Sequence, residues 1–179
     1  MSDTETKVIS DPEKTFAVIQ SAVNKMVDLI RKTLGPSANK VIISTPLYRV
    51  VVDDGVQIAR DFKLMDPAEN AVIEVIRETA IKTNDRVGDG TTGSLIILQA
   101  IINEVARLGR RDGRKIVLEL QRGLLEIKAQ LLKAKKEIKT KEDLRKVALI
   151  SFDNESIANA IADLYMKLGK DGVVTIEKS

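Results

Sequence analysis

Residues 84–98 read Asn-Asp-Arg-Val-Gly-Asp-Gly-Thr-Thr-Gly-Ser-Leu-Ile-Ile-Leu, and they decide the fold because a polar glycine loop runs directly into an almost wholly apolar helix. The two glycines that flank Asp89 allow backbone conformations that a Cβ forbids, and they let a ligand approach the main chain. Thr91, Thr92 and Ser94 add hydroxyls around the first helical turn, whose amides have no partner within the helix. We therefore expect an anion, phosphate above all, to bind at this junction.

Asp89 has two interpretations. Its carboxylate would repel phosphate oxygens unless a cation lies between them, and Mg²⁺ commonly binds one or two carboxylates together with phosphate oxygens and water. Alternatively, Asp89 only caps the helix by accepting a backbone hydrogen bond, which is the commoner role of an isolated acid before a helix. Both interpretations remain open on the loop alone.

The composition limits the chemistry that this chain can perform. Its 179 residues include neither His nor Cys, which excludes imidazole bases, thiol nucleophiles and the common zinc sites. Carboxylates, hydroxyls, lysines, main-chain amides and a hard metal ion remain. The first residues are polar and no apolar stretch is long enough to span a bilayer, so we expect a soluble, cytoplasmic protein without a membrane partner.

The residue pattern predicts a mainly α protein with small β elements. Asp11-Pro12 and Asp66-Pro67 are typical helix starts, because Pro is favoured at the first helical position. The apolar periodicity predicts helices over about 12–32, 67–82, 91–108 and 115–136, and shorter helices after Thr140 and Asn154. The β-rich runs 40–44 and 47–52 predict a hairpin, and short strands are expected at 7–10 and 173–176.

The helix over residues 91–108 is expected to be the centre of the fold. Its apolar side chains point in nearly every direction around the axis, so neighbouring elements should surround it. Replacing Ile97 with Ala should then cost about 2–5 kcal/mol.

Two other segments carry groups that could meet a ligand. Residues 33–36, Thr-Leu-Gly-Pro, end the first helix, since Gly can adopt a left-handed conformation and Pro cannot continue the helix. Asp53, Asp54 and Gly55 follow the hairpin, and on their own they are typical of a simple turn. The basic turn over 107–115 has no aromatic residues for base stacking, so a solvated or subunit-contacting loop is favoured over a nucleic-acid site.

Four motifs together resemble the chaperonins in their order and spacing. They are Thr-Leu-Gly-Pro at 33–36, Asp-Asp-Gly at 53–55, Gly-Asp-Gly-Thr-Thr at 88–92 and Gly-Lys-Asp-Gly-Val-Val-Thr at 169–175. Residues 59–62 and 150–151 are similar to the bacterial group I type, whereas residues 66–68 and 175–178 are nearer to the archaeal and eukaryotic type. We describe the resemblance as group I-like.

The resemblance implies an ATP-driven protein-folding cage of two stacked rings of identical subunits, with unfolded proteins as clients and a lid co-chaperonin as a candidate partner. Residues 1–136 would form the N-terminal half of a multihelical equatorial ATP-binding domain, and residues 137–179 would begin an α/β intermediate domain. The apical domain, the second equatorial half and the family's principal catalytic Asp would lie beyond residue 179. We therefore expect little or no ATP hydrolysis from residues 1–179 alone.

The resemblance also implies roles for individual residues. Asp89 would bind Mg²⁺, with K⁺ as a second candidate cation, and Asp54 would be catalytic, near the γ-phosphate and the attacking water. Further ATP-binding residues would be Thr33, Leu34, Gly35, Pro36, Asp53, Gly55, Gly90, Thr91, Thr92 and Gly93. Asp53 stands where the bacterial family usually has Lys, and Gly93 where it has a third Thr. The first change adds a negative charge beside the phosphates, and the second removes a hydroxyl.

Two other functions stay open at this point. A short ring-assembly or nucleotide-sensing scaffold would use the same helices without ATPase activity. A small basic nucleic-acid-binding protein ranks last, because a net charge of +3 permits such a partner without arguing for it.

Overall fold

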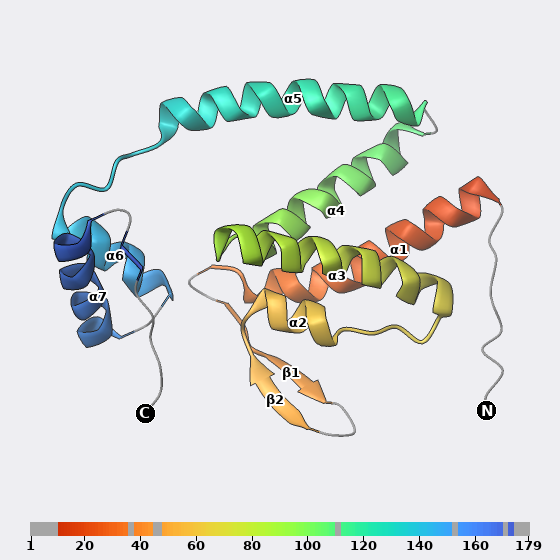
Figure 1. The fold of residues 1–179 in the computed structure, drawn as a ribbon. Coiled ribbons are helices and arrows are strands. Elements are labelled where there is room, and N and C mark those ends of the chain that lie inside the picture. The colour runs from red at the N-terminus through yellow and green to blue at the C-terminus, as the bar shows by residue number, and fades with distance from the viewer. Residues whose placement is uncertain are drawn as a thin grey trace. The chain divides into compact units, whose positions relative to one another are not determined.

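The computed structural model describes residues 11–35, 38–44, 48–109, 112–151, 154–169 and 172–173. Their contacts form two compact units, Met1–Asp112 and Gly113–Ser179. The elements of the first unit are α1 (Pro12–Ile30), the 3₁₀ helix η1 (Arg31–Thr33), β1 (Val41–Ser44), β2 (Arg49–Val52), α2 (Gly55–Asp61), α3 (Pro67–Val87) and α4 (Thr91–Leu108). Figure 1 labels the α-helices and the two strands. The second unit contains α5 (Gly113–Ala134), α6 (Lys141–Ser151) and α7 (Glu155–Leu168). The prediction of a mainly helical protein with a small hairpin is confirmed.

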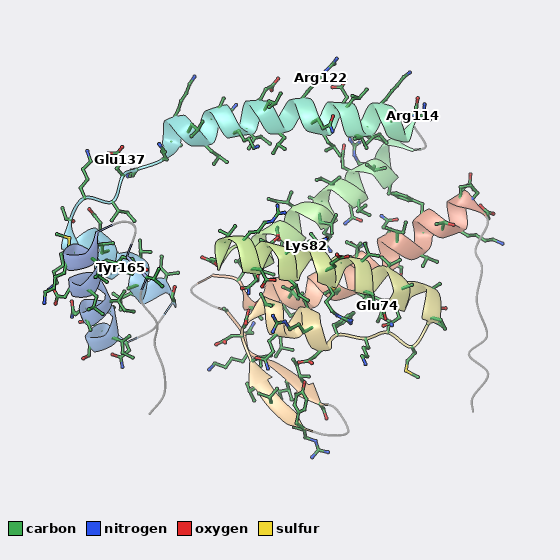
Figure 2. The ribbon with its side chains drawn as sticks, in the orientation of Figure 1. Glu74, Lys82, Arg114, Arg122, Glu137 and Tyr165 are labelled. Atoms are coloured by element: carbon green, nitrogen blue, oxygen red, sulfur yellow. The ribbon has the colours of Figure 1, made fainter. Side chains whose placement is uncertain are left out.

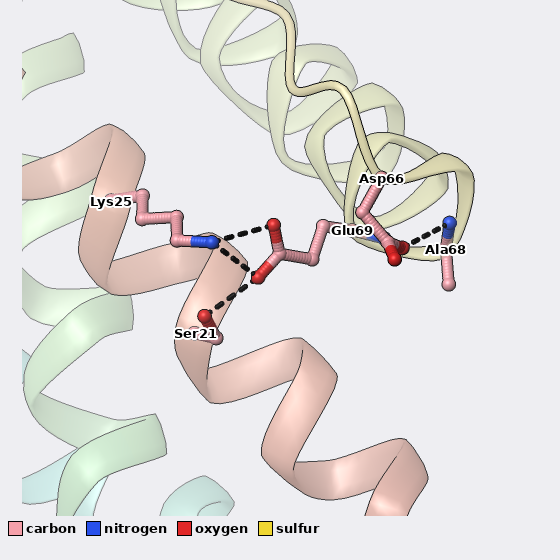
Figure 3. Close-up of polar contacts among 5 residues, drawn as sticks. All are labelled: Ser21, Lys25, Asp66, Ala68 and Glu69. Atoms are coloured by element: carbon pink, nitrogen blue, oxygen red, sulfur yellow. Dashed lines mark hydrogen bonds and ion pairs between the residues drawn. The ribbon is translucent and has the colours of Figure 1, made fainter.

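The Asp-Pro pairs begin helices as predicted. Asp11 Oδ1 accepts a hydrogen bond from Glu13 N at 2.8 Å, and Asp66 Oδ1 accepts one from Ala68 N at 2.8 Å (Figure 3). Each bond satisfies one of the amides that a helix start leaves without an intrahelical partner.

The predicted hairpin is also present. Strands β1 and β2 pair antiparallel, with Val41 opposite Val52 and Ser44 opposite Arg49. Strand β1 also contacts α2. Only residues 53 and 54 separate the end of β2 from the start of α2.

The core of the first unit follows one stripe of α1. Its buried side chains, spaced by three or four residues, are Ala22, Val23, Met26, Val27 and Ile30. Buried residues of the neighbouring elements pack against this stripe: Val52, Ile58, Ala59, Ile73, Ile76, Ala80 and Leu95. The helix that the others are built around is therefore α1.

The predicted position of α4 at the centre is corrected by its burial. The helix has the predicted bounds, but among its apolar side chains only Leu95 is fully buried, and Ile97 is 62% exposed. It packs one side against α1, α2 and α3, and no described element covers Ile97. Ile97→Ala should therefore cost far less than the value expected for a surrounded helix, about 0.5 kcal/mol or less.

Helix α3 is longer than predicted. It continues through Asn84 to Val87, which the sequence pattern assigned to the loop, and it ends at Gly88 with φ 76°. The glycine supplies the left-handed conformation that commonly ends a helix. Only residues 88–90 separate α3 from α4, so the loop is shorter than the motif suggested.

In the second unit, α6 and α7 pack against each other around Ala148, Ala158 and Ala162. Helix α5 has no buried side chain along its described length, and Figure 2 shows Arg114 and Arg122 extending from it. The predicted strand at 7–10 and residues 174–176 of the other lie outside the described residues.

Candidate functional site

Three helix ends of the first unit meet at Gly55. A Cβ built on Gly55 would collide with Thr92 Oγ1 and lie 3.3 Å from Ile30 Cγ2. Ile30 is the last residue of α1, and Thr92 is in the first turn of α4. The start of α2, the end of α1 and the start of α4 are therefore packed together, and only Gly fits at their junction without displacing a neighbour.

The segment after α1 turns away from the helix at Gly35. Thr33 Oγ1 donates to Ile30 O at 2.8 Å, which ties the threonine to the end of the helix. Leu34 is 56% exposed, and Gly35 has φ 89°. Pro36, the fourth residue of this motif, lies outside the described residues. Because η1 contacts α4, this turn and the first turn of α4 lie in the same part of the unit.

The start of α4 has no side-chain cap. Gly90 is the N-cap residue with φ 82°, and no side chain accepts from the amides that follow it. Asp89 Oδ1 instead accepts a hydrogen bond from the adjacent Gly90 N at 2.6 Å, and the Asp89 carboxylate is exposed. Asp89 is thus not an N-cap of the ordinary kind, although one of its oxygens does bond to its own main chain.

The side chains of the first α4 turn differ in their accessibility. Thr91 is only 6% exposed, whereas Thr92 and Gly93 are half-buried. The backbone amides at this turn and the Thr92 hydroxyl are therefore better suited than the Thr91 side chain to meet a ligand from solvent.

Asp53 and Asp54 have separate partners. Asp54 caps α2, because its Oδ1 accepts from Val56 N at 2.9 Å. Asp53 lies 3.8 Å from Lys40 Nζ, with both side chains exposed. Lys40 was not predicted to lie near the site. The hairpin register explains its position: Val41 pairs with Val52, so the residues next to them, 40 and 53, lie side by side where they leave the strands. Lys40 therefore offsets the negative charge that Asp53 adds.

A metal ion at this site would have few protein ligands. Among the described residues, no group of three or more His, Cys, Asp or Glu side chains is arranged to hold a metal. A single exposed carboxylate such as that of Asp89 fits Mg²⁺, which usually keeps several waters and completes its shell with substrate phosphates.

Sequence reasoning also missed a polar seam between α1 and α4, which consists of Gln20, Asn24, Asp28, Arg31, Gln99 and Asn103. Their side chains form a chain of hydrogen bonds between the two helices. The signal was present as polar residues four apart, at 20, 24 and 28 and again at 99 and 103, within helices whose other faces are apolar.

Among the described residues, no helix combines the length and the apolar character needed to cross a membrane.

Solved structures similar to this chain include chaperonins. The chaperonin gp146 from the bacteriophage EL 2 (Pseudomonas aeruginosa), crystallised in the presence of ATP-BeFx, is 25% identical in one crystal form, with a TM-score of 0.70 over 86% of this chain. A second crystal form of gp146 is 26% identical, with a TM-score of 0.71 over the same share. A group III chaperonin in the open state is 22% identical, with a TM-score of 0.75 over 90% of this chain, and this match supports the fold alone.

This chain spans only part of those proteins, 28% of each gp146 chain and 33% of the group III chain. The matches do not single out the bacterial group I type. The profile of the TCP-1/cpn60 chaperonin family matches residues 26–174, which include most of both units and three of the four motifs in full. The chain belongs to the TCP-1/cpn60 chaperonin family.

Proposed function

We propose that this chain contributes the nucleotide-binding part of a chaperonin subunit that binds and hydrolyses Mg-ATP to change the shape of a protein-folding cage. The observation that carries the proposal is the junction at Gly55, where the end of α1, the start of α2 and the start of α4 meet. A site formed from three segments far apart in sequence is more specific than any one of its motifs. Family membership supports the same activity.

The open start of α4 is the proposed phosphate site. Uncapped amides at a helix start attract anions, since they present unpaired donors and the positive end of the helix dipole. Gly90, Thr91, Thr92 and Gly93 would supply these donors, with the backbone doing more than the buried Thr91 side chain. Residues 33–36 and Gly55 would border the nucleotide. The space beside Gly90 and Gly93 is open, because a Cβ at either position would meet no atom of the described residues within 4 Å apart from its neighbours along the chain.

Asp89 is the proposed Mg²⁺ ligand, and K⁺ is a second candidate cation. When bound, Mg²⁺ would offset the negative charge of the phosphate oxygens. Asp54 is the proposed catalytic residue, which would orient the attacking water. Asp53 would affect affinity only weakly, because Lys40 lies 3.8 Å away and balances its charge.

The assembly follows from family membership and is proposed on that basis. We infer a ring of identical subunits, two rings stacked, unfolded proteins as clients, a lid co-chaperonin and a cytoplasmic location. We also propose that residues 1–136 belong to the equatorial domain and residues 137–179 to the intermediate domain, and that the protein is of the group I type. The two gp146 crystal forms, obtained with ATP-BeFx, support nucleotide use in a relative.

The test is Asp89→Ala in the complete protein that contains this sequence. We expect Mg-ATP binding or turnover to be abolished while the unfolding transition stays unchanged, because the one hydrogen bond lost is to an adjacent exposed amide. Isothermal titration with Mg-ATP and a steady-state phosphate assay measure the two activities.

The matched control is Asp85→Ala, which removes an exposed acid from the last turn of α3. It should retain both activities. Unchanged ATPase in Asp89→Ala would remove Asp89 from the mechanism. If the complete wild-type protein does not bind Mg-ATP at all, a non-catalytic ring scaffold becomes the better account.

A further inference from the structure

Gln99 is a buried amide in the contact between α1 and α4, with only 3% of its surface exposed. Its Oε1 accepts from Arg31 Nη2 at 2.6 Å, and its Nε2 donates to Asp28 Oδ1 at 2.8 Å and to Asn24 Oδ1 at 3.0 Å. A guanidinium can only donate and a carboxylate can only accept, so the two ends of the amide cannot be exchanged. The orientation of Gln99 is therefore determined by its partners.

Arg31 connects this amide to the proposed nucleotide site. It is the first residue of η1, and Thr33 is the last. Gln99 follows Thr91 by eight residues, about 12 Å along the axis of α4 at the usual helical rise. The Arg31–Gln99 bond thus fixes the exit of α1 against a definite point on α4, two turns from the uncapped start.

Among the described side chains, the other half of the polar seam, around Asn103, meets Gln99 only through the shared Asn24. Asn103 Nδ2 donates to Asn24 Oδ1 at 2.9 Å, Asn24 Nδ2 donates to Asn103 Oδ1 at 3.2 Å, and Gln20 Nε2 donates to Asn103 Oδ1 at 2.9 Å. Asn103 lies one turn farther from the start of α4 and has no hydrogen bond to Arg31 among those of the described residues. It provides a matched control for Gln99.

We propose that Gln99, held between Arg31 and Asp28, is a positioning residue that sets the spacing between residues 33–35 and the first turn of α4. The proposal rests on the proposed Mg-ATP function. Apolar side chains tolerate small sliding of one helix along another, but α4 cannot slide along α1 without breaking directional bonds to a buried amide. A shift there would carry Thr92 away from the segment that follows α1.

Gln99→Leu in the complete protein should raise the Kd for Mg-ATP about tenfold, the size of a typical coupling between contacting residues. Asn103→Leu removes an amide from the same interface and should leave the Kd within about twofold of the wild type. Both titrations are made well below the unfolding midpoint of each variant, so that loss of stability does not alter the result. An equal loss of affinity in the two variants would overturn the positioning role.

Arg31→Met separates positioning from direct contact with the nucleotide. Arg31 is exposed, so this variant also tests the connection if Gln99→Leu fails to fold. We expect Arg31→Met to weaken Mg-ATP binding by the same factor as Gln99→Leu, and the double variant to be no weaker than either. Multiplicative losses would mean that Arg31 touches the nucleotide independently, and would overturn the proposal. Wild-type protein that fails to bind Mg-ATP would refute the proposed function itself, a result distinct from either failure above.

Discussion

The described part of the first unit contains four α-helix starts, of which three are capped by a side chain and one is not. Asp11, Asp54 and Asp66 each accept an amide hydrogen bond from the helix that they precede, whereas α4 begins at Gly90 without a side-chain cap. The first turns of α1 and α3 also contain a glutamate, and the first turn of α4 contains no acid. The helix start that local chemistry leaves open is the one where we propose that phosphate binds.

Asp54 and Asp66 give the most direct test of the difference between a helix start at the proposed site and one elsewhere. Both residues cap a helix, but only Asp54 lies at the proposed site. Asp54→Ala should slow ATP hydrolysis about 100-fold and weaken ATP binding much less, as expected for a residue that orients the attacking water. Asp66→Ala should lower the free energy of unfolding by about 1 kcal/mol and keep wild-type turnover per bound ATP.

Single-turnover hydrolysis and ATP titration on both variants separate the two effects. A loss of affinity with normal turnover in Asp54→Ala would reduce Asp54 to a capping residue with an indirect effect on binding.

Gly55 and Gly93 test the packing of α2 against α4, because an added Cβ would meet a neighbour at Gly55 but not at Gly93. A Cβ on Gly55 would collide with Thr92 Oγ1 and lie close to Ile30, so Gly55→Ala should destabilise the protein by about 1–3 kcal/mol. A Cβ on Gly93 would meet no atom within 4 Å, and Gly93 is inside a helix, so Gly93→Ala should stabilise it by up to about 1 kcal/mol. Urea unfolding of the two variants measures both values. If Gly55→Ala were as harmless as Gly93→Ala, the close packing of α2 on α4 would be absent in solution.

Two of the three capped helix starts, those of α1 and α3, were predictable from sequence because their chemistry is local, whereas Asp54 was interpreted as part of a turn and its role as the cap of α2 was not predicted. An Asp-Pro pair sets both the cap and the first helical residue within two positions, and α1 and α3 begin where those pairs predict. The hairpin was predictable for the same reason, since its two β-rich runs are adjacent. Residues 84–87 were assigned wrongly because polar side chains before a glycine suit both a loop and the exposed last turn of a helix.

The features that require contacts between distant segments were not predictable in detail. An all-round apolar pattern indicated that α4 was surrounded, yet pattern alone cannot say which faces the neighbouring elements cover, and Ile97 is exposed. Four motifs indicated which residues form the candidate site, but the approach of Gly55 to Thr92 depends on how three helices pack. The charge of Asp53 appeared uncompensated until the hairpin register brought Lys40 beside it.

The capped start of α3 also holds α1, through Glu69 in its first turn (Figure 3). The Glu69 carboxylate accepts from Lys25 Nζ at 2.6 and 2.7 Å and from Ser21 Oγ at 2.7 Å. The Lys25 bonds, followed by that of Ser21, hold the pKa of Glu69 below its usual value. The first turn of α4 contains no acidic residue that could bond to another helix in this way. The uncapped start of α4 differs from the capped start of α3 in this respect as well.

Of the effects predicted here, we expect the smallest to be the pH-dependent contribution of Glu69 to the stability of the folded protein. Because its pKa is lower in the folded than in the unfolded protein, its contribution is complete above the unfolded pKa and is lost as pH falls through the folded pKa. The wild type should be more stable than Glu69→Gln at pH 7, and urea unfolding at decreasing pH should show the difference shrinking below the ordinary glutamate pKa. Glu78→Gln, which breaks an exposed pair with Lys82 inside α3, should change stability less, since solvent screens that pair. Equal effects of the two substitutions would mean that Glu69 does not hold α1 and α3 together.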